Sequence, residues 1–392
     1  MKQHTFSQNL QSEERSEYPK VDPITSGMTE YAFVLRCVRP NPKLCPVGPV
    51  RSRILHGINW EQVIRIATYN NVTPLFLHNI KMIAGDVLPT KIKTHIEQYF
   101  QVNHSHNQIQ LQELGHLTKI LKNNKIRTII LKGRPLGSEA YGDTLVRRST
   151  DFDVLIPADK FPEAENLLLA EGYNPYQKVQ NLKGLKKQIN LWFSKQYPFQ
   201  KYKGLFNLDL HIAVMPPGYH YPVNFDQLWE RSKSISMNGI EIRALEPEEL
   251  LILLSYHGVK NQWHNLKYVC DIAALLESHP DLKWETILVR ARRNRCQRFV
   301  LIGLALANSL LDASLPSQIE QQIQNDEMVK KVVSTCMKIL RLRHTRRTFS
   351  YKERVWFHLA TREDYREKVR YVLMSLMVNI WSSLFKRNPV EN

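Results

Sequence analysis

Residues 148–156 read Arg148-Ser149-Thr150-Asp151-Phe152-Asp153-Val154-Leu155-Ile156, the pattern of a buried strand with two carboxylates at its start. Residues two apart in a strand point to the same face, so Asp151 and Asp153 are expected side by side. Adjacent carboxylates repel each other unless a cation or a proton lies between them. The pattern therefore predicts a site for a hard divalent cation such as Mg²⁺, which prefers oxygen ligands. A strand edge with solvated charges is the alternative.

A second strand is predicted over residues 205–214, where polar and apolar residues alternate. The alternation places Asp209 and His211 on one face. If this strand lies beside the first, Asp209 supplies a third carboxylate, and three carboxylates can hold the two metal ions used in phosphoryl chemistry. For His211, a hydrogen-bonded structural histidine is the alternative to a role at the site.

A β-branched run at residues 126–131 predicts a buried strand that ends at Lys132-Gly133. Lys132 is a point charge suited to a phosphate, and Gly133 allows a positive φ or a close approach of the backbone. Residues 135–142 are long enough for a short helix, whose first N–H groups attract anions. An ordinary strand–turn–helix connection fits the same spacing.

As an ordered set, these motifs resemble the uncharacterised nucleotidyltransferase family of the polymerase-β-like nucleotidyltransferase superfamily. The resemblance covers residues 122–276. It rests on Leu131-Lys132-Gly133, Tyr141, the stretch 148–155, Gly172-Tyr173, Asp209-Leu210-His211, the segment 254–260, Trp263, Leu266 and Asp271-Ile272-Ala273. In one respect the chain departs from the wider superfamily, because Lys132-Gly133 stands where a Gly-Ser signature usually precedes the carboxylates.

The resemblance implies an α+β fold, in which a polymerase-β-like nucleotidyltransferase core with a small mixed sheet is flanked by N- and C-terminal helical regions. The expected divisions are a disordered tail at 1–29, a helical region at 30–121, the core at 122–245 and a basic helical region at 246–392.

The same resemblance implies a role for each site residue. Asp151, Asp153 and Asp209 are the expected catalytic residues and ligands of Mg²⁺ or Mn²⁺, and Asp209 is expected to help deprotonate the acceptor. The expected nucleotide-binding residues are Lys132, Gly133, Arg148 and Ser149, with His211 and His257 beside them. As alternatives, Arg148 forms a structural ion pair, Ser149 only shapes a turn, and His257 belongs to a packed helix face with Lys260 and His264.

The implied reaction is attack of an acceptor oxygen on the α-phosphorus of an NTP such as ATP, with pyrophosphate leaving. A small-molecule or peptide intermediate of a biosynthetic pathway is the first expectation for the acceptor. Two alternatives stay open: a toxin-like enzyme that modifies a protein or tRNA, and a nucleotide-binding protein without catalysis.

The net charge of +17 is concentrated toward the C-terminus, where residues 281–392 hold 21 Lys or Arg against 11 Asp or Glu. Arginines cluster at 290–298 and again at 341–347. A basic surface of this kind could bind nucleic acid, attract a phosphorylated small substrate, or form a solvated helix face.

The chain has no run of about 18 apolar residues, so no membrane-spanning helix is expected. The five scattered cysteines are typical of reduced thiols in the cytoplasm. The apolar stretch at 371–385 is flanked by Lys and Arg and predicts a terminal core helix, with contact to a membrane interface as the alternative. The sequence leaves the oligomeric state open.

Overall fold

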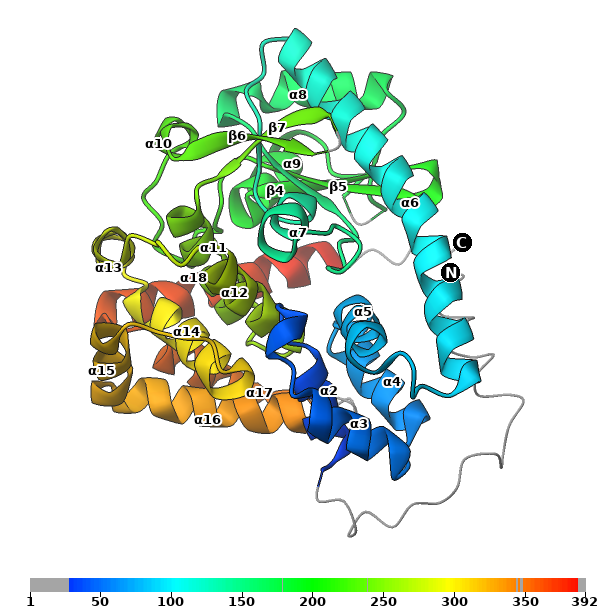
Figure 1. Ribbon diagram of the computed structural model, residues 1–392. Helices are drawn as coiled ribbons and strands as arrows, with labels where there is room; N and C mark the ends of the chain where they lie inside the picture. Colours follow the sequence, from blue (N-terminus) through cyan, green and yellow to red (C-terminus); the bar gives the residue numbers. More distant parts are fainter. Residues whose placement is uncertain (1–27, 178, 238, 343–344, 346–347, 387–392) are drawn as a thin grey trace.

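A mixed sheet of seven strands occupies one end of the molecule, and helices surround it (Figure 1). The computed structural model describes residues 28–177, 179–237, 239–342, 345 and 348–386. The strands lie in the order β3-β4-β5-β2-β1-β7-β6. Their bounds are β1 Ile129–Ile130, β2 Phe152–Leu155, β3 Asn174–Pro175, β4 Gln196–Lys201, β5 Phe206–His211, β6 Ser232–Met237 and β7 Ile240–Leu245. The expected small mixed sheet is confirmed.

The predicted acidic strand, β2, is the middle strand of the sheet. It pairs parallel with β5 and antiparallel with β1, and all four of its residues are buried. Phe152 and Val154 face one side of the sheet and join a cluster with Leu208 and Leu210 of β5. The burial of a central strand on both faces explains its apolar pattern and makes the carboxylate of Asp153 an exception within it.

One long helix, α6, connects the N-terminal helices to the sheet. In Figure 1 it runs from the helices at the bottom along one side of the sheet. Its leucines at 111, 114, 117 and 121 follow helical spacing and pack in the cluster that contains β2 and β5. The helices of this part are α2 Glu30–Cys37, α3 Val47–Leu55, α4 Trp60–Tyr69, α5 Thr73–Ala84 and α6 Thr90–Asn123.

The remaining helices lie between the strands or follow the sheet. Between the strands lie α7 Arg134–Tyr141, α8 Phe161–Ala170, α9 Gly184–Ser194 and α10 Phe225–Glu230. After the sheet come α11 Pro247–Lys260, α12 Leu266–Ser278, α13 Trp284–Arg293, α14 Gln297–Leu311, α15 Ser317–Asn325, α16 Glu327–Leu342, α17 Tyr351–Ala360 and α18 Tyr365–Lys386. Helical flanks on both sides of the core are therefore confirmed.

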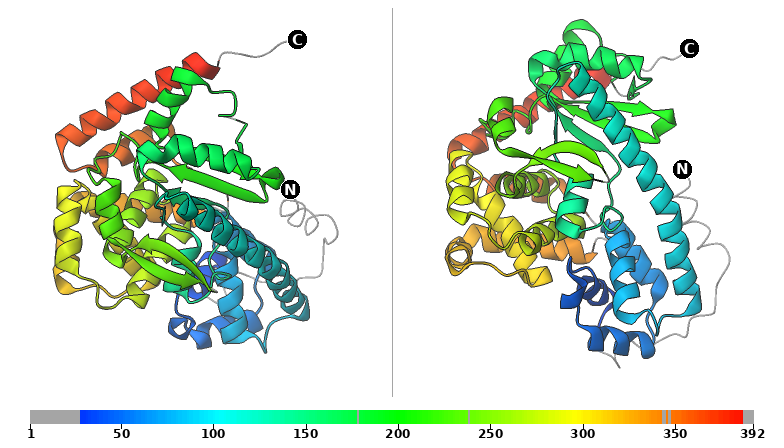
Figure 2. Two further views of the ribbon diagram at one scale, coloured as in Figure 1. Left: turned by 90° about the horizontal axis from the view of Figure 1, so that it is seen from above. Right: turned by 45° about the horizontal axis from the view of Figure 1, so that its top comes forward.

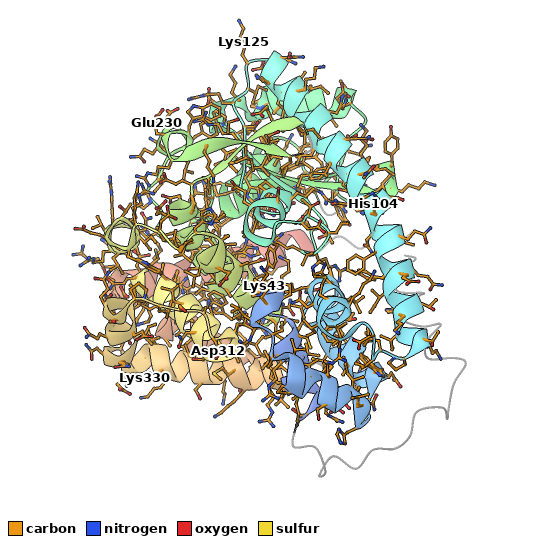
Figure 3. The ribbon with its side chains drawn as sticks, in the orientation of Figure 1. Lys43, His104, Lys125, Glu230, Asp312 and Lys330 are labelled. Atoms are coloured by element: carbon orange, nitrogen blue, oxygen red, sulfur yellow. The ribbon has the colours of Figure 1, made fainter. Side chains whose placement is uncertain are left out.

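The N-terminal and C-terminal helical regions share one apolar core, although they are far apart in the sequence. Asn41 donates to Glu277 at 2.8 Å, and Arg39 pairs with Asp312, which Figure 3 labels. Within this core Trp263 is fully buried against α11, where a Cβ added at Gly258 would lie 2.4 Å from its ring. Glycine at position 258 is thus required by the packing of the tryptophan.

The described residues bear on the expected N-terminal tail and on the expected absence of a membrane-spanning helix. Residues 1–27 of the expected tail lie outside the described residues, whereas Met28 is buried and the hydroxyl of Thr29 caps α2 by accepting from the Ala32 amide at 3.2 Å. Among the described helices, none has both the length and the apolar character needed to cross a membrane.

All five cysteines are buried free thiols.

A buried histidine in α17 makes stability depend on pH. Burial, with the charges of Arg362 and Arg354, lowers the pKa of His358 from 6.5 to about 3. The unfolded chain therefore takes up a proton below about pH 6.5, while the native state stays neutral, and stability is lost as the pH falls. Between about pH 7 and pH 5 we expect His358 to cost about 2 kcal/mol in the free energy of unfolding.

Urea unfolding at the two pH values measures this cost. His358→Phe should reduce the loss of stability on acidification by about 2 kcal/mol relative to the wild type. The matched variant His104→Phe changes an exposed residue of α6 and should leave the loss unchanged (Figure 3). An identical pH dependence in His358→Phe and the wild type would show that His358 takes up a proton as readily in the native state as in the unfolded chain.

Candidate functional site

Two carboxylates meet where β2 and β5 run side by side. The strands are parallel, and Asp153 lies directly opposite Asp209. Side chains opposite each other on neighbouring strands point to the same face, about 4.8 Å apart at the backbone. Asp153, Asp209 and His211 offer ligand atoms that all lie within 4.8 Å of one another. The structure thus brings these three predicted residues together.

Asp151 stands slightly apart from that group. It precedes β2 by one residue, is half-buried, and its carboxylate accepts from the Thr150 hydroxyl at 3.5 Å. It is not among the three residues with ligand atoms within 4.8 Å. Its negative charge nevertheless raises the pKa of Asp209, so it lies within electrostatic range of the pair.

Asp153 is held ionised by its neighbours. Lys132 donates to Oδ2 of Asp153, and Nε2 of His211 lies 3.3 Å from Oδ1. Burial by itself raises the pKa of Asp153, but the charge of Lys132 and the hydrogen bond from His211 outweigh it and hold the pKa well below the usual range. The charges of Asp153 and Asp151 likewise overcome burial and raise the pKa of Lys132.

The pKa of Asp209 is shifted in the opposite direction, above its usual value. Burial raises its pKa, the charge of His211 opposes this, and the charges of Asp153 and Asp151 raise it further. Gln196 at the start of β4 donates to Oδ2 of Asp209 at 3.1 Å. Nothing in the sequence around Gln196 pointed to this contact, because it depends on the pairing of β4 with β5. The two carboxylates therefore sit in environments that separate their pKa values, as acid–base pairs in active sites do.

The predicted turn at Lys132-Gly133 opens helix α7. Gly133 is the N-terminal cap of that helix and has φ +87°, a conformation that side chains disfavour. A Cβ added there would lie 3.0 Å from the Ser149 hydroxyl, which itself donates to the Asp151 carbonyl at 3.4 Å. The predicted nucleotide-binding residues Lys132, Gly133 and Ser149 thus lie against the entrance of the acidic strand.

Gly133→Ala is expected to destabilise the protein by about 1–3 kcal/mol, because the new methyl group adds a clash to a strained backbone. Gly142→Ala is the comparison variant, because Gly142 lies in the left-handed helical region at φ +71° and ψ −8°, with nothing within 4 Å of an added Cβ. Thermal unfolding should show a larger loss of stability in Gly133→Ala, since Gly133 has ψ −121°, outside that region, and its added Cβ also meets Ser149. Equal destabilisation of the two variants would contradict this expectation.

A buried ion pair lies beneath this turn. Arg147 donates to both carboxylate oxygens of Asp271 at 2.7 and 2.8 Å, and also to the Gly133 carbonyl at 3.0 Å. The Tyr141 hydroxyl donates to the same carboxylate at 3.0 Å. Arg147 and Asp271 are each 3% exposed at the side chain. The network fixes the turn of Gly133 to helix α12.

Arg148, which was predicted to bind a phosphate, contacts a residue of the N-terminal helical region. It donates to the side-chain oxygen of Asn71 at 3.2 Å, and Asn71 belongs to the turn between α4 and α5. This contact joins the loop that precedes β2 to the N-terminal helices. Nucleotide binding by Arg148 stays a prediction.

Helices α11 and α12 add positive charge near the carboxylates. Burial lowers the pKa of Lys260, and Lys132 lowers it further, while Asp153 and Asp209 raise it. Burial and the charge of Arg147 lower the pKa of Lys267 to about 8. His257 lies 5.3 Å from the Tyr268 ring, and burial followed by the charge of Lys132 lowers its pKa well below the usual value. His257 is therefore neutral at pH 7.

Three of the five arginines of the first basic cluster form ion pairs within the protein. Arg290 pairs with Glu246 and Glu249, Arg295 with Asp364 at 3.0 Å and Arg298 with Asp326 at 2.9 Å. Of the second cluster, residues 343, 344, 346 and 347 lie outside the described residues. The charge of these three arginines is already balanced, whereas Arg292 and Arg293 are exposed on the same part of the surface. Nucleic-acid binding through the first cluster stays a prediction.

Comparisons with known proteins place the chain in a family. The sequence profile described as "Uncharacterised nucleotidyltransferase" matches residues 56–312, and the chain belongs to this family. The match confirms the resemblance found in residues 122–276 and extends it into the helices on both sides. No curated protein matches the chain.

Among solved structures, four chains match. One is the solution structure of the antibiotic-resistance factor ANT(2'')-Ia, whose title reports substrate-regulated conformation dynamics. It shares 15% sequence identity with this chain, and the match covers 47% of this chain and 91% of that one at a TM-score of 0.32.

Proposed function

We propose that the protein is a metal-dependent nucleotidyltransferase that moves an NMP from an NTP to a hydroxyl or phosphate oxygen of a small-molecule or peptide intermediate. The observation that carries the proposal is the placement of Asp153 and Asp209 in register on neighbouring parallel strands, with Lys132 bound to Asp153. Three charged groups converge there in a largely buried environment. Such an arrangement is costly for stability alone and is typical of a site that binds charged ligands.

The donor set fits Mg²⁺ or Mn²⁺. Asp153 and Asp209 supply carboxylate oxygens, which hard divalent cations prefer, while the His211 nitrogen is a donor that Mn²⁺ accepts more readily than Mg²⁺. Asp151, one residue before β2, is the third carboxylate in the proposed set, and its charge already acts on Asp209. A bound ion would neutralise charge on the attacking and leaving oxygens of a phosphoryl transfer.

The residues of the chain have separate tasks in this reaction. Asp209, with its raised pKa, accepts the proton of an acceptor hydroxyl. The acceptor oxygen then bonds to the α-phosphorus, the bond from that phosphorus to the β-phosphate oxygen breaks, and pyrophosphate leaves with the bonding electrons. Lys132, the amide groups at the start of α7, Ser149 and Arg148 bind the phosphates. Lys260 and Lys267 add a positive field that favours the triphosphate.

Isothermal titration of the full chain with each NTP tests the proposal, with and without Mg²⁺ or Mn²⁺. We expect binding of at least one NTP that requires the metal and is lost in the Asp151→Ala, Asp153→Ala double variant. Asp226→Ala, which changes an exposed acid in α10, should bind as the wild type does. Binding that is independent of metal, or equal in the double variant, would contradict the proposal.

A further inference from the structure

The C-terminal helix α18 turns an apolar face away from the molecule. Side chains of this face recur at intervals of three or four residues, so they form one stripe along the helix. They are 38% to 77% exposed and comprise Tyr365, Val369, Val372, Leu373, Leu376, Met377 and Ile380. Surface helices normally show the reverse arrangement, with the apolar stripe toward the core. Contiguous exposed apolar surface of this kind marks an interaction site.

The opposite face of α18 fixes the helix to the protein. Glu367 is buried and pairs with Arg295, which lies outside α18 between α13 and α14. The Arg362 guanidinium lies 4.2 Å from the Tyr371 ring, and Trp381 contacts the Phe193 ring of α9 at 6.1 Å. Because polar and aromatic anchors hold this inner face, the helix cannot bury its apolar stripe by simple rotation. Figure 2 shows α18, in red, along the outer edge of the molecule.

Charge identifies the partner that fits this face. The acidic residue of α18 is the buried Glu367, whereas Arg366 and Lys368 are basic and at least partly exposed. Helix α9, which contacts the end of α18, also exposes Leu185, Trp192 and Lys186. A second copy of a chain with net charge +17 would be repelled, but an anionic surface would be attracted.

We propose that α18 docks in the interface of an anionic lipid bilayer, with its apolar stripe in the boundary between headgroups and acyl chains. An amphipathic helix with basic residues beside its apolar face binds such surfaces through buried area and charge together. The helix lies on the surface and does not cross it, which agrees with the absence of a spanning helix among the described residues. This inference is independent of the proposed nucleotidyl transfer.

Docking there would also bring the candidate site to the membrane. Helix α9 contacts α18 through Phe193 and leads directly into β4, whose Gln196 donates to Asp209. The lipid-facing surface and the carboxylates are thus joined through a short stretch of chain.

Co-sedimentation of the full chain with lipid vesicles tests the proposal. One set of vesicles holds phosphatidylcholine alone, and the other holds phosphatidylcholine and phosphatidylglycerol in equal parts. The variant Leu373→Ser, Leu376→Ser, Ile380→Ser removes apolar side chains that are already exposed, so it should fold as the wild type does. The control is Leu55→Ser, Met82→Ser, Val102→Ser, which changes apolar residues of the N-terminal helices that are at least as exposed.

We expect the wild type and the control to bind the anionic vesicles, and binding to weaken as salt is added. The α18 variant should bind at least about tenfold more weakly, because each lost apolar side chain contributes to insertion. Absence of binding, equal binding to uncharged vesicles, or unchanged binding of the α18 variant would overturn the proposal. So would a dimer, detected by light scattering, that the α18 variant abolishes, because a second copy would then cover the face.

Discussion

Asp153→Asn is expected to weaken Mn²⁺ binding in the presence of an NTP by more than about a hundredfold, since loss of groups that merely support a metal ligand already costs 10–100-fold. The asparagine keeps the shape and one acceptor oxygen of the side chain, so the change isolates the charge. Without that charge, Lys132 and the cation compete for a single neutral oxygen. Nucleotidyl transfer to any acceptor should fall at least as far, because the carboxylate is ionised at every physiological pH.

Electron paramagnetic resonance of free Mn²⁺ measures this binding directly. Asp159→Asn is the matched control, because Asp159 is an exposed acid that follows the same strand and should bind Mn²⁺ as the wild type does. Lys132→Met should separate the two functions of the site, with metal binding retained and NTP affinity reduced. If Asp153→Asn kept the Mn²⁺ affinity of the wild type, Asp153 would not be a metal ligand.

Asp271→Ala is expected to destabilise the protein by about 3–5 kcal/mol, the usual cost of leaving one partner of a buried ion pair without the other. The change leaves the Arg147 guanidinium in the protein interior without its carboxylate partner, and it removes the acceptor of the Tyr141 hydroxyl. It also frees Lys267, which lies 3.3 Å from Asp271. Since Arg147 also holds the Gly133 carbonyl, NTP affinity should fall together with stability.

Urea unfolding of the single and double variants tests this effect. The double variant Arg147→Met, Asp271→Leu removes both charges and should regain part of the lost stability, because no guanidinium is then left in the interior without its carboxylate. The recovery should be incomplete, because the contacts to Lys267, Tyr141 and the Gly133 carbonyl are also lost. The exposed ion pair of Arg127 and Asp226 provides the control, and Asp226→Ala should have little effect. A loss of less than about 1 kcal/mol in Asp271→Ala would show that water solvates Arg147.

Local patterns in the sequence were sufficient to predict the elements that carry the site. Alternation of polar and apolar residues predicted the strands that became β2 and β5, and Gly133 predicted the turn that opens α7. The neighbourhood of Asp153 and Asp209 could be expected only from the family resemblance, because strand order is a long-range property that periodicity does not encode.

The contacts missed from the sequence depend on tertiary packing. Arg147 and Arg148 are adjacent in the sequence, and nothing local shows that Arg147 enters the core while Arg148 reaches Asn71. Gln196 meets Asp209 only because β4 pairs with β5. The 371–385 stretch was predicted as a terminal core helix; the helix is confirmed, but its place in the core is wrong. Its apolar face is exposed because polar contacts of Glu367 fix the helix with the opposite face inward.

The position of a bound metal ion tests the proposed catalytic centre most directly. Crystals of the full chain grown with Mn²⁺ and a non-hydrolysable NTP analogue would locate the ion by its anomalous diffraction. We predict a peak between the carboxylates of Asp153 and Asp209, with the triphosphate toward Lys132 and the start of α7. A nucleotide bound elsewhere, or a Mn²⁺ peak away from both carboxylates, would contradict the assignment of Asp153 and Asp209 as the catalytic centre.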